Sequence, residues 1–500
     1  MNWKKYPIIL FTFCLFTGLL QAQKTSHVHG SAPDYALKVI SVFSYTDFVS
    51  ERKQWLTSDV VDENGSFDLE IPCAEITYIG IRCDHVTAYM YLEPQTNYRI
   101  SFLSPEVGTS VTFNDKAETE LIFEELELSD INSLIIDFNY RYEGFFTQNY
   151  ELLQRMFAPT NKQDLADSLG HVARKAVKGN IEQLLDKMEQ FALNMDTMYV
   201  EFDLPYFKSY RTAVLGDMML NSKMDPRDFF DRFIAPRSFQ AQHRAQTELQ
   251  KKFYRYYFLR HAQSYGNEEL GEVLNDLGSY TRLCELVSKD DFMETEVRRD
   301  IVLSMAIAEV WGNKSMEKDK LADILASIGK ESKSEAASKV ALDLLHVLNS
   351  NEKGFPAYSF SLYDQFNDRI SIEGLSGRPI IIQFWASWCS DCQSEQVLFD
   401  LLSNTHKNDF YFISMNMDDL EDIPSIVKRD KHVHHLLGIS DPLIKESYKV
   451  NSLPFYVLID ENGLIYDYDG KRPSEGLESI LLKWKKKKEE TKRTIGSKEN

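Results

Sequence analysis

Short runs of alternating apolar and polar residues dominate the first hundred residues that follow an apolar leader. Phe67–Ile71 and Tyr98–Phe102 are runs of this kind, with turn-forming residues between them. Alternation with a period of two predicts strands that bury one face. Asn64-Gly65 precedes one run, and Asn-Gly accepts the positive φ that a tight hairpin turn requires. We therefore expect residues 23–115 to form a small all-β sandwich.

Helical spacing replaces this alternation between residues 116 and 350. Ile181, Leu184 and Met188 are separated by three and four residues, which places them on one face of a helix. Aromatic residues are dense in Phe253–Phe258. We expect an all-α domain whose aromatic side chains fill the core, and the alternative is a groove that binds a partner polypeptide. No catalytic spacing stands out in this segment.

Longer apolar runs return after the polar linker Asn351–Gly354. Ile380–Phe384 and Phe410–Met415 are nearly continuous apolar segments, as is typical of strands buried on both faces. Phe455–Ile459 is a third such strand, followed by a hairpin turn at 460–463 and a closing helix at 477–486. This pattern predicts an α/β domain over residues 352–486. A chain of 500 residues is long enough for three domains.

The N-terminus has the pattern of an export signal. Lys4 and Lys5 precede the thirteen-residue apolar run Ile8–Leu20. A membrane span needs about 20 apolar residues, so this run fits a signal peptide better than a transmembrane helix. We expect residues 1–22 to be cleaved and the mature protein to be soluble in the periplasm or cell envelope.

The charge of the chain narrows the choice of partners. Its formal net charge is −20, whereas a nucleic-acid binder usually presents a basic face. The one basic run lies at the C-terminus, and residues 487–500 are predicted to be a solvated charged tail. His432–His435 is interpreted as a solvated helix end. His27 and His29 are placed in an exposed N-terminal segment, and neither group is expected to bind a metal.

The sequence WASWCSDCQSE at residues 385–395 carries the candidate chemistry. A buried strand precedes Cys389 and a helix follows it, so Cys389 should cap the helix N-terminus with its sulfur exposed. Unpaired N–H groups and the helix dipole favour a thiolate there. Cys392 lies one turn further along and should be shielded. This spacing suits thiol–disulfide exchange, in which Cys389 attacks and Cys392 resolves the mixed disulfide.

The motif allows three other interpretations. A zinc site would need a second pair of ligands, and the sequence has no other closely spaced cysteine pair. A peroxidase would usually have Thr at position 386, where this chain has Ala386. The third alternative is a non-catalytic cell-envelope binding protein with a vestigial dithiol. Cys73 and Cys83 either form a structural disulfide or remain as buried thiols, and Cys284 is expected in a core.

The segments IIIQFWASWCSDC and YKVNSLPFYVLIDENG resemble those of exported thioredoxin-fold proteins of the TlpA/ResA type. The resemblance covers about residues 352–486 and implies a thioredoxin fold there. It further implies that Pro454 is a cis-proline and that the backbone of Leu453 pairs with substrate, with Trp388 as a third substrate-binding residue. The N-terminal strands resemble the β-domain often fused to such proteins in Bacteroidetes-type bacteria.

The sequence departs from the family pattern beside the dithiol. Gln383 stands where cytoplasmic thioredoxins have a buried Asp, and the resemblance then assigns the proton-transfer role to Glu395. Val397 replaces a family proline two residues after this glutamate. Asp391 replaces the usual proline before the second cysteine, and its negative charge should disfavour a thiolate. These departures predict a dithiol toward the reducing end of its superfamily.

The resemblance also implies a function and partners. We expect a protein disulfide reductase that acts without a bound cofactor on disulfide-bearing cell-envelope proteins. Apocytochrome c and misoxidised proteins are the candidate substrates, which would connect the protein to cytochrome c maturation and to redox homeostasis. A membrane electron donor of the DsbD/CcdA type would have to regenerate the dithiol, because the periplasm is otherwise oxidising.

Overall fold

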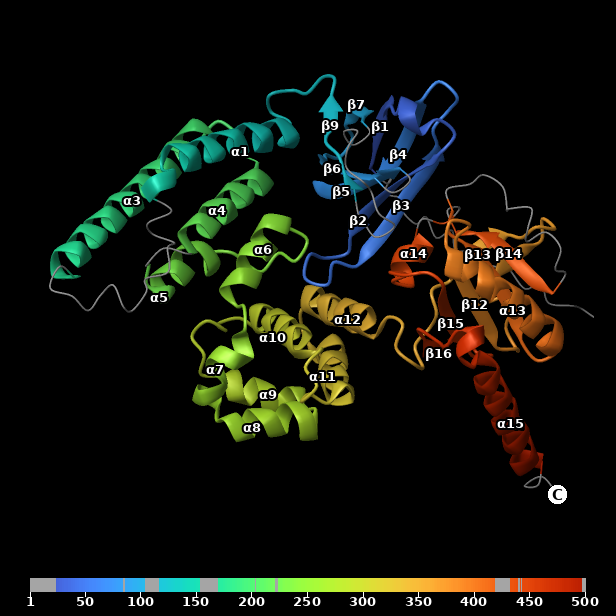
Figure 1. Ribbon diagram of the computed structural model, residues 1–500. Helices are drawn as coiled ribbons and strands as arrows, with labels where there is room; N and C mark the ends of the chain where they lie inside the picture. The colour runs from blue at the N-terminus through green and yellow to red at the C-terminus, as the bar shows by residue number, and fades with distance from the viewer. Residues whose placement is uncertain are drawn as a thin grey trace, which may run out of the picture.

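The computed structural model describes most of the chain in three parts, drawn in Figure 1 as blue, green-to-yellow and orange-to-red ribbons. The predicted signal peptide lies outside the described residues, as does the last part of the predicted tail. The structure describes residues 24–496 except for 84–85, 104–116, 153–169, 203, 221–223, 419–431, 439–440 and 442.

The first part is a β-sandwich, as the alternating pattern predicted. A four-stranded sheet packs on a five-stranded sheet, and the core between them is almost entirely apolar. Strands β8 and β9 lie beyond residue 115, the predicted end of this domain. The sheet orders are β4-β1-β7-β9 (Ser66–Pro72, Thr25–Ser31, Asn97–Phe102, Leu121–Phe123) and β3-β2-β5-β6-β8 (Lys53–Val60, Val39–Tyr45, Thr77–Cys83, Val86–Leu92, Ala117–Glu118).

Strand β1 corrects the expectation that His27 and His29 lie in an exposed N-terminal segment. β1 is an interior strand that pairs antiparallel with β4 and parallel with β7. Its sequence is mostly polar, so the strand pattern is weak, and only Ser26 and Val28 are buried. Gly30 permits the close approach of β7, because a Cβ atom there would lie 2.0 Å from the carbonyl oxygen of Ile100.

The tight turn predicted at Asn64-Gly65 is present, but it does not close a hairpin, because β3 before it pairs with β2 and β4 after it pairs with β1 in the other sheet. Gly65 has a φ of +81°, and the Asp62 N–H donates to the carbonyl of Ser66 across the turn at 2.8 Å. A Cβ atom at Gly65 would also lie 2.5 Å from the Cα of Pro33. Glycine is therefore required at this position both for its backbone conformation and for space.

The second part is helical, and the described helices begin at Ile131. The aromatic segment Phe253–Phe258 contributes to its core as predicted: Phe253, Tyr254 and Tyr257 are buried, whereas Tyr256 faces outward. The helices are α1 (Ile131–Gln148), α3 (Gly170–Met198), α4 (Pro205–Leu220), α5 (Pro226–Phe229), the π-helix η2 (Phe230–Ile234), α6 (Arg244–Phe253), α7 (Tyr257–Tyr265), α8 (Asn267–Glu272), the π-helix η3 (Val273–Leu277), α9 (Tyr280–Val287), α10 (Glu296–Val310), α11 (Lys318–Glu331) and α12 (Glu335–Asn349).

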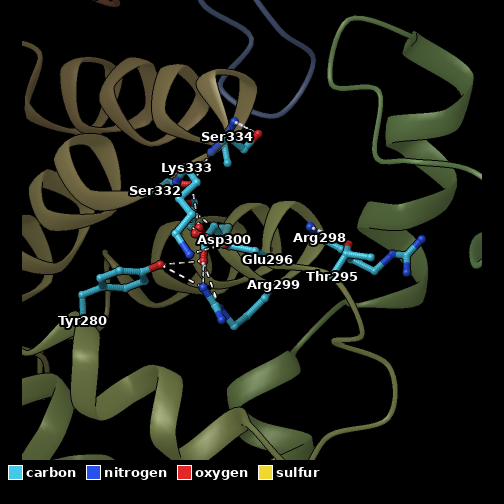
Figure 2. Close-up of polar contacts among 11 residues, drawn as sticks. Tyr280, Thr295, Glu296, Arg298, Arg299, Asp300, Ser332, Lys333 and Ser334 are labelled. Atoms are coloured by element: carbon cyan, nitrogen blue, oxygen red, sulfur yellow. Dashed lines mark hydrogen bonds and ion pairs between the residues drawn. The ribbon is translucent and has the colours of Figure 1, made fainter.

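A polar network centred on Asp300 joins three segments of this domain (Figure 2). Asp300 is fully buried and accepts hydrogen bonds from the hydroxyls of Tyr280 at 2.8 Å and Ser332 at 2.7 Å. Arg299 pairs with the same carboxylate at 2.9 Å. The network ties α9 and the start of the α11–α12 turn to α10. Because the buried charge has both a counter-charge and two hydroxyl donors, removing any one partner would leave a buried polar group unsatisfied.

The third part is a five-stranded mixed sheet with the order β14-β13-β12-β15-β16. Apolar clusters cover both of its faces, one of them against α13 and α15, and a short hairpin (β10, Ser361–Tyr363; β11, Arg369–Ser371) precedes it. The other elements are β12 (Ile380–Trp385), α13 (Ser390–His406), β13 (Tyr411–Asn416), β14 (Val433–Leu437), α14 (Leu443–Ser447), β15 (Phe455–Ile459), β16 (Ile465–Tyr468), η5 (Pro473–Glu475) and α15 (Leu477–Gly496).

Two sequence expectations in this domain need correction. The segment containing His432–His435 is not a solvated helix end, because β14 is a strand at the sheet edge and His435 is buried. Helix α15 continues to Gly496, beyond residue 486 where the closing helix was predicted to end. Across the described residues, every helix is too short or too polar to cross a membrane.

Ion pairs and hydrogen bonds connect the three parts. Lys53 of β3 pairs with Glu446 of α14 at 2.8 Å, and the neighbouring Arg52 pairs with Asp343 of α12 at 2.6 Å. Asn351, in the predicted linker, donates to the carbonyl of Ser447 at 2.8 Å. The β2–β3 side of the sandwich therefore contacts both the helical domain and α14.

Candidate active site

The two cysteines lie where β12 ends and α13 begins. Cys389 is the N-cap of α13, and the Cys392 N–H donates to its sulfur at 3.1 Å. The structure shows the pair oxidised, with an S–S bond of 2.08 Å. Cys392 is fully buried, as predicted, but Cys389 is only 8% exposed, less than the sequence suggested. The Cys392 N–H therefore donates a hydrogen bond to the Cys389 sulfur, the sulfur expected to react, and such a donor favours a thiolate there.

Pro454 follows a cis peptide bond, which confirms the prediction made from the family resemblance. Leu453 packs against the cluster formed by Trp385, Ala386 and the two cysteines. Trp388 lies in the loop before the dithiol and is 62% exposed. The fold thus brings Leu453 and Pro454 beside the cysteines, although more than 60 residues separate them in the chain.

A buried aspartate that the sequence reasoning missed holds the loop before Cys389. Both carboxylate oxygens of Asp418 accept the Ser387 N–H at 2.9 Å, and Asn416 donates to the same carboxylate at 2.8 Å. The carbonyl of Ser387 in turn accepts from the Gln393 side chain at 2.7 Å. Asp418 follows β13, the strand next to β12. The sequence alone does not show that these two strands are neighbours, so it could not place Asp418 beside the loop.

Glu395 is 5% exposed and lies on α13, one turn beyond Cys392. One carboxylate oxygen accepts the Ser474 N–H at 3.1 Å, and the other accepts the Ser474 hydroxyl. Its hydrogen bonds within the described part of the chain therefore go to the η5 turn rather than to the Cys392 sulfur. Helix α13 runs unbroken through the exposed Val397, where the family has proline.

Asp391, next to the cysteines, has a counter-charge that the sequence did not reveal. Arg472 lies 3.5 Å from its carboxylate, immediately before the η5 turn that holds Glu395. The Asp391 side chain is 70% exposed. Water and Arg472 both screen its charge, so its effect on the sulfurs should be smaller than the sequence alone predicted.

A row of buried polar side chains crosses the sheet beneath α13. Tyr456, Gln383, Ser414 and His435 occupy neighbouring register positions on four adjacent strands, from β15 to β14. Gln383 donates to the Tyr456 hydroxyl at 2.9 Å. Burial, reinforced by the nearby charge of Glu395, raises the pKa of Tyr456 well above its ordinary range. The row is therefore a buried polar layer next to the predicted proton-transfer residue.

The remaining cysteines of the described chain lie away from this site. Cys73 and Cys83 are buried and not joined by a disulfide, and Cys284 is partly buried in the helical domain. Burial raises the pKa of the Cys73 and Cys284 thiols, which keeps both protonated at neutral pH. Within the described ranges, no cluster of three or more His, Cys, Asp or Glu side chains is arranged to hold a metal ion.

Comparison with known proteins agrees with this geometry. The family model described as Redoxin matches residues 350–480. The thioredoxin-like protein YneN of Bacillus subtilis is 25% identical over 119 residues, covering 23% of this chain and 70% of its own. The thiol-disulfide oxidoreductase ResA of Bacillus thuringiensis is 27% identical over 136 residues, covering 26% and 78%.

A solved structure is similar to part of the chain. The thioredoxin domain of a thiol-disulfide oxidoreductase from Bacteroides vulgatus is 22% identical and covers 26% of this chain and 96% of its own, with a TM-score of 0.23. Fold, dithiol and sequence relatives together define residues 350–480 as a redoxin domain of the TlpA/ResA type, the class of thiol–disulfide oxidoreductases.

Proposed function

We propose that this protein reduces disulfide bonds in cell-envelope proteins. The observation that carries the proposal is the Cys389–Cys392 pair at the N-terminus of α13, packed against Leu453 beside the cis peptide bond. In this assignment Cys389 is the attacking residue and Cys392 the resolving residue. Trp388, Leu453 and Pro454 contact the substrate, and Leu453 pairs with it through its backbone.

The reaction begins with the reduced protein. The Cys389 thiolate attacks a substrate disulfide, so one new S–S bond forms and one substrate sulfur leaves as a thiolate that takes a proton. Cys392 loses its proton and attacks the Cys389 sulfur, which releases the second substrate thiol. Two electrons and two protons pass to the substrate, and the chain ends in the oxidised form seen in the structure.

Proton removal from Cys392 needs a nearby base, and Glu395 is our candidate. It is buried one turn along the same helix and is the nearest carboxylate of α13 to follow the cysteines. Gln383 cannot accept the proton as a carboxylate would, although it lies where cytoplasmic thioredoxins have one. The pair with Ser474 would have to loosen, or pass the proton, when Glu395 acts.

The direction and location are parts of the same proposal. A neutral Gln383 and the negative Asp391 both favour a reductant, toward the lower end of a superfamily range of about −270 to about −120 mV. The predicted signal peptide supports a periplasmic or envelope location. Apocytochrome c and misoxidised proteins are the proposed substrates, with a membrane electron donor of the DsbD/CcdA type as the source of electrons.

Insulin reduction by the full chain tests the enzymatic assignment. Wild type should reduce insulin disulfides in the presence of dithiothreitol, and Cys389→Ser should fall to the uncatalysed rate. Cys284→Ser, which removes a thiol from the helical domain, should match wild type. Equal rates for wild type and Cys389→Ser would instead support a binding protein with a vestigial dithiol.

A trapping experiment tests the partners. Cys392→Ser should accumulate mixed disulfides on Cys389, because the resolving thiol is missing. Their identification by mass spectrometry should show envelope proteins with cysteine pairs. Trapping no partner in cells, while the purified variant still forms a mixed disulfide with insulin, would contradict the proposed substrate class but not the chemistry.

A further inference from the structure

The helical domain contains a cavity that the redox chemistry does not use. Its volume is about 490 Å³, within the range of about 300–1,000 Å³ typical of small-molecule sites. It lies between the C-terminal end of α3, the first half of α4 and the turn after the π-helix η2. Tyr199, Phe202 and Phe233 form much of its apolar wall.

Positive charge dominates the polar part of the wall. Four cationic residues line the cavity against a single carboxylate: Lys208, Arg211, Arg232 and Arg237 against Asp196. The chain as a whole has a formal charge of −20, so a cationic cavity is unusual within it. Cations gathered in a partly enclosed space attract anions more strongly than the same charges spread over a surface.

Two of these cations already have counter-charges. Arg211 pairs with Asp196 at 3.0 Å, and Arg232 pairs with Glu189 at 3.1 Å. Arg237 instead donates to the hydroxyl of Thr212 at 3.0 Å. As far as the described residues extend, Arg237 and Lys208 have no carboxylate within ion-pair distance. The cavity therefore keeps an uncompensated positive charge.

Hydrogen bonds from the Arg298 side chain fix the backbone that carries Arg237. Arg298, almost fully buried, donates to the carbonyls of Ile234 at 3.1 Å and Arg237 at 2.9 Å. Figure 2 shows its side chain extending away from the Asp300 network of the same helix. Burial also lowers the pKa of Arg237, because the guanidinium loses hydration.

We propose that this cavity binds a small organic anion with an aromatic or other apolar body. Arg237 and Lys208 would bind the acidic group, and the rings of Tyr199 and Phe233 would contact the apolar body. The cavity size fits a small molecule. Because the wall combines aromatic rings with cations, an anion that also has an apolar body matches it better than a purely apolar or a purely inorganic ligand. This site is independent of the proposed disulfide reduction.

The test uses two fluorescent probes with the same rings. 1-Anilinonaphthalene-8-sulfonate is anionic, whereas N-phenyl-1-naphthylamine lacks the sulfonate. The full chain should bind the anionic probe at one saturable site. Arg237→Gln should weaken that binding at least tenfold and change the affinity for the neutral probe less than twofold, whereas Arg237→Lys should retain most of the affinity.

Lys314→Gln is the matched control, since it removes one positive charge from an exposed turn of the same domain. It should bind both probes as wild type does, and all variants should keep the wild-type unfolding temperature. If Arg237→Gln does not fold, the exposed Lys208 provides a second variant, Lys208→Gln, with at least a threefold loss expected. Absence of saturable binding by wild type, or equal affinity in the Arg237, Lys208 and Lys314 variants, would overturn the proposal.

Discussion

Asp300 and Glu395 are both buried carboxylates, but their surroundings differ. Asp300, in the helical domain, has Arg299 as a counter-charge and two hydroxyl donors. Glu395, on α13 of the redoxin domain, has only the neutral Ser474 as its hydrogen-bond partner in the described structure. The nearby guanidinium of Arg472 pairs with Asp391 instead.

This difference is consistent with a structural role for Asp300 and with the proton-transfer role proposed above for Glu395. Removing the carboxylate of Asp300 would leave the Arg299 cation without its counter-charge, so Asp300 has a structural role. Around Glu395 the Gln383 side chain, the Tyr456 hydroxyl and Ser474 are neutral, and gain or loss of a proton disturbs no ion pair. A carboxylate in such surroundings suits general acid–base chemistry.

Asp300→Ala should produce the largest change, and the change should be in stability. Loss of the carboxylate leaves the Arg299 charge and two hydroxyls without their acceptor, which should lower the free energy of unfolding by about 3–5 kcal/mol. Urea denaturation measures this, with Asp323→Ala on the exposed side of α11 as the control, expected within about 0.5 kcal/mol of wild type. A loss below about 1 kcal/mol would contradict the structural role, as would a slower insulin reduction per folded molecule.

Glu395→Gln should instead slow the chemistry while the fold is retained. The amide oxygen can still accept from Ser474, so the free energy of unfolding should change by less than about 1 kcal/mol. Loss of the proton acceptor should lower the single-turnover rate of disulfide reduction about 100-fold and flatten its pH profile. Ser474→Ala keeps the carboxylate and should lose less than tenfold. A wild-type rate for Glu395→Gln would contradict the proton-transfer role and leave Glu395 with only a structural contact to η5.

The exposed pair of Asp391 and Arg472 should have the smallest effect, on the reduction potential. Such pairs contribute at most about 1 kcal/mol, which corresponds to about 20 mV for a two-electron couple. Arg472→Gln leaves the Asp391 charge unscreened beside the thiolate and should lower the potential. Asp391→Asn should raise it. Equilibration with glutathione measures both, and shifts of the same sign would contradict this electrostatic account.

The dithiol could be predicted because its signals are local. The buried strand before Cys389, the helix after it and the two-residue spacing lie within one short stretch of sequence. Pro454 was placed by family resemblance, and the structure confirms its cis bond. The roles of Glu395 and of the substrate contacts remain predictions that the experiments above address.

The partners of the site could not be predicted because they are distant in sequence and have no periodic pattern. Ser474 meets Glu395 across 79 residues, and Arg472 reaches Asp391 across a similar distance. His435 was misplaced because polar residues normally indicate solvent exposure. In the folded sheet it stands beside Ser414, in a buried polar row that no single strand reveals.

Strand β1 has a practical consequence for recombinant versions of the chain. Its residues Thr25–Ser31 follow closely on the predicted signal peptide and are mostly polar, yet they separate β4 from β7 in the four-stranded sheet. A version trimmed to start at residue 32 would expose two strand edges to unpaired contact with other molecules. Recombinant versions should therefore retain every residue from 24 onward. An N-terminal affinity tag should be added before Lys24 and should not replace β1.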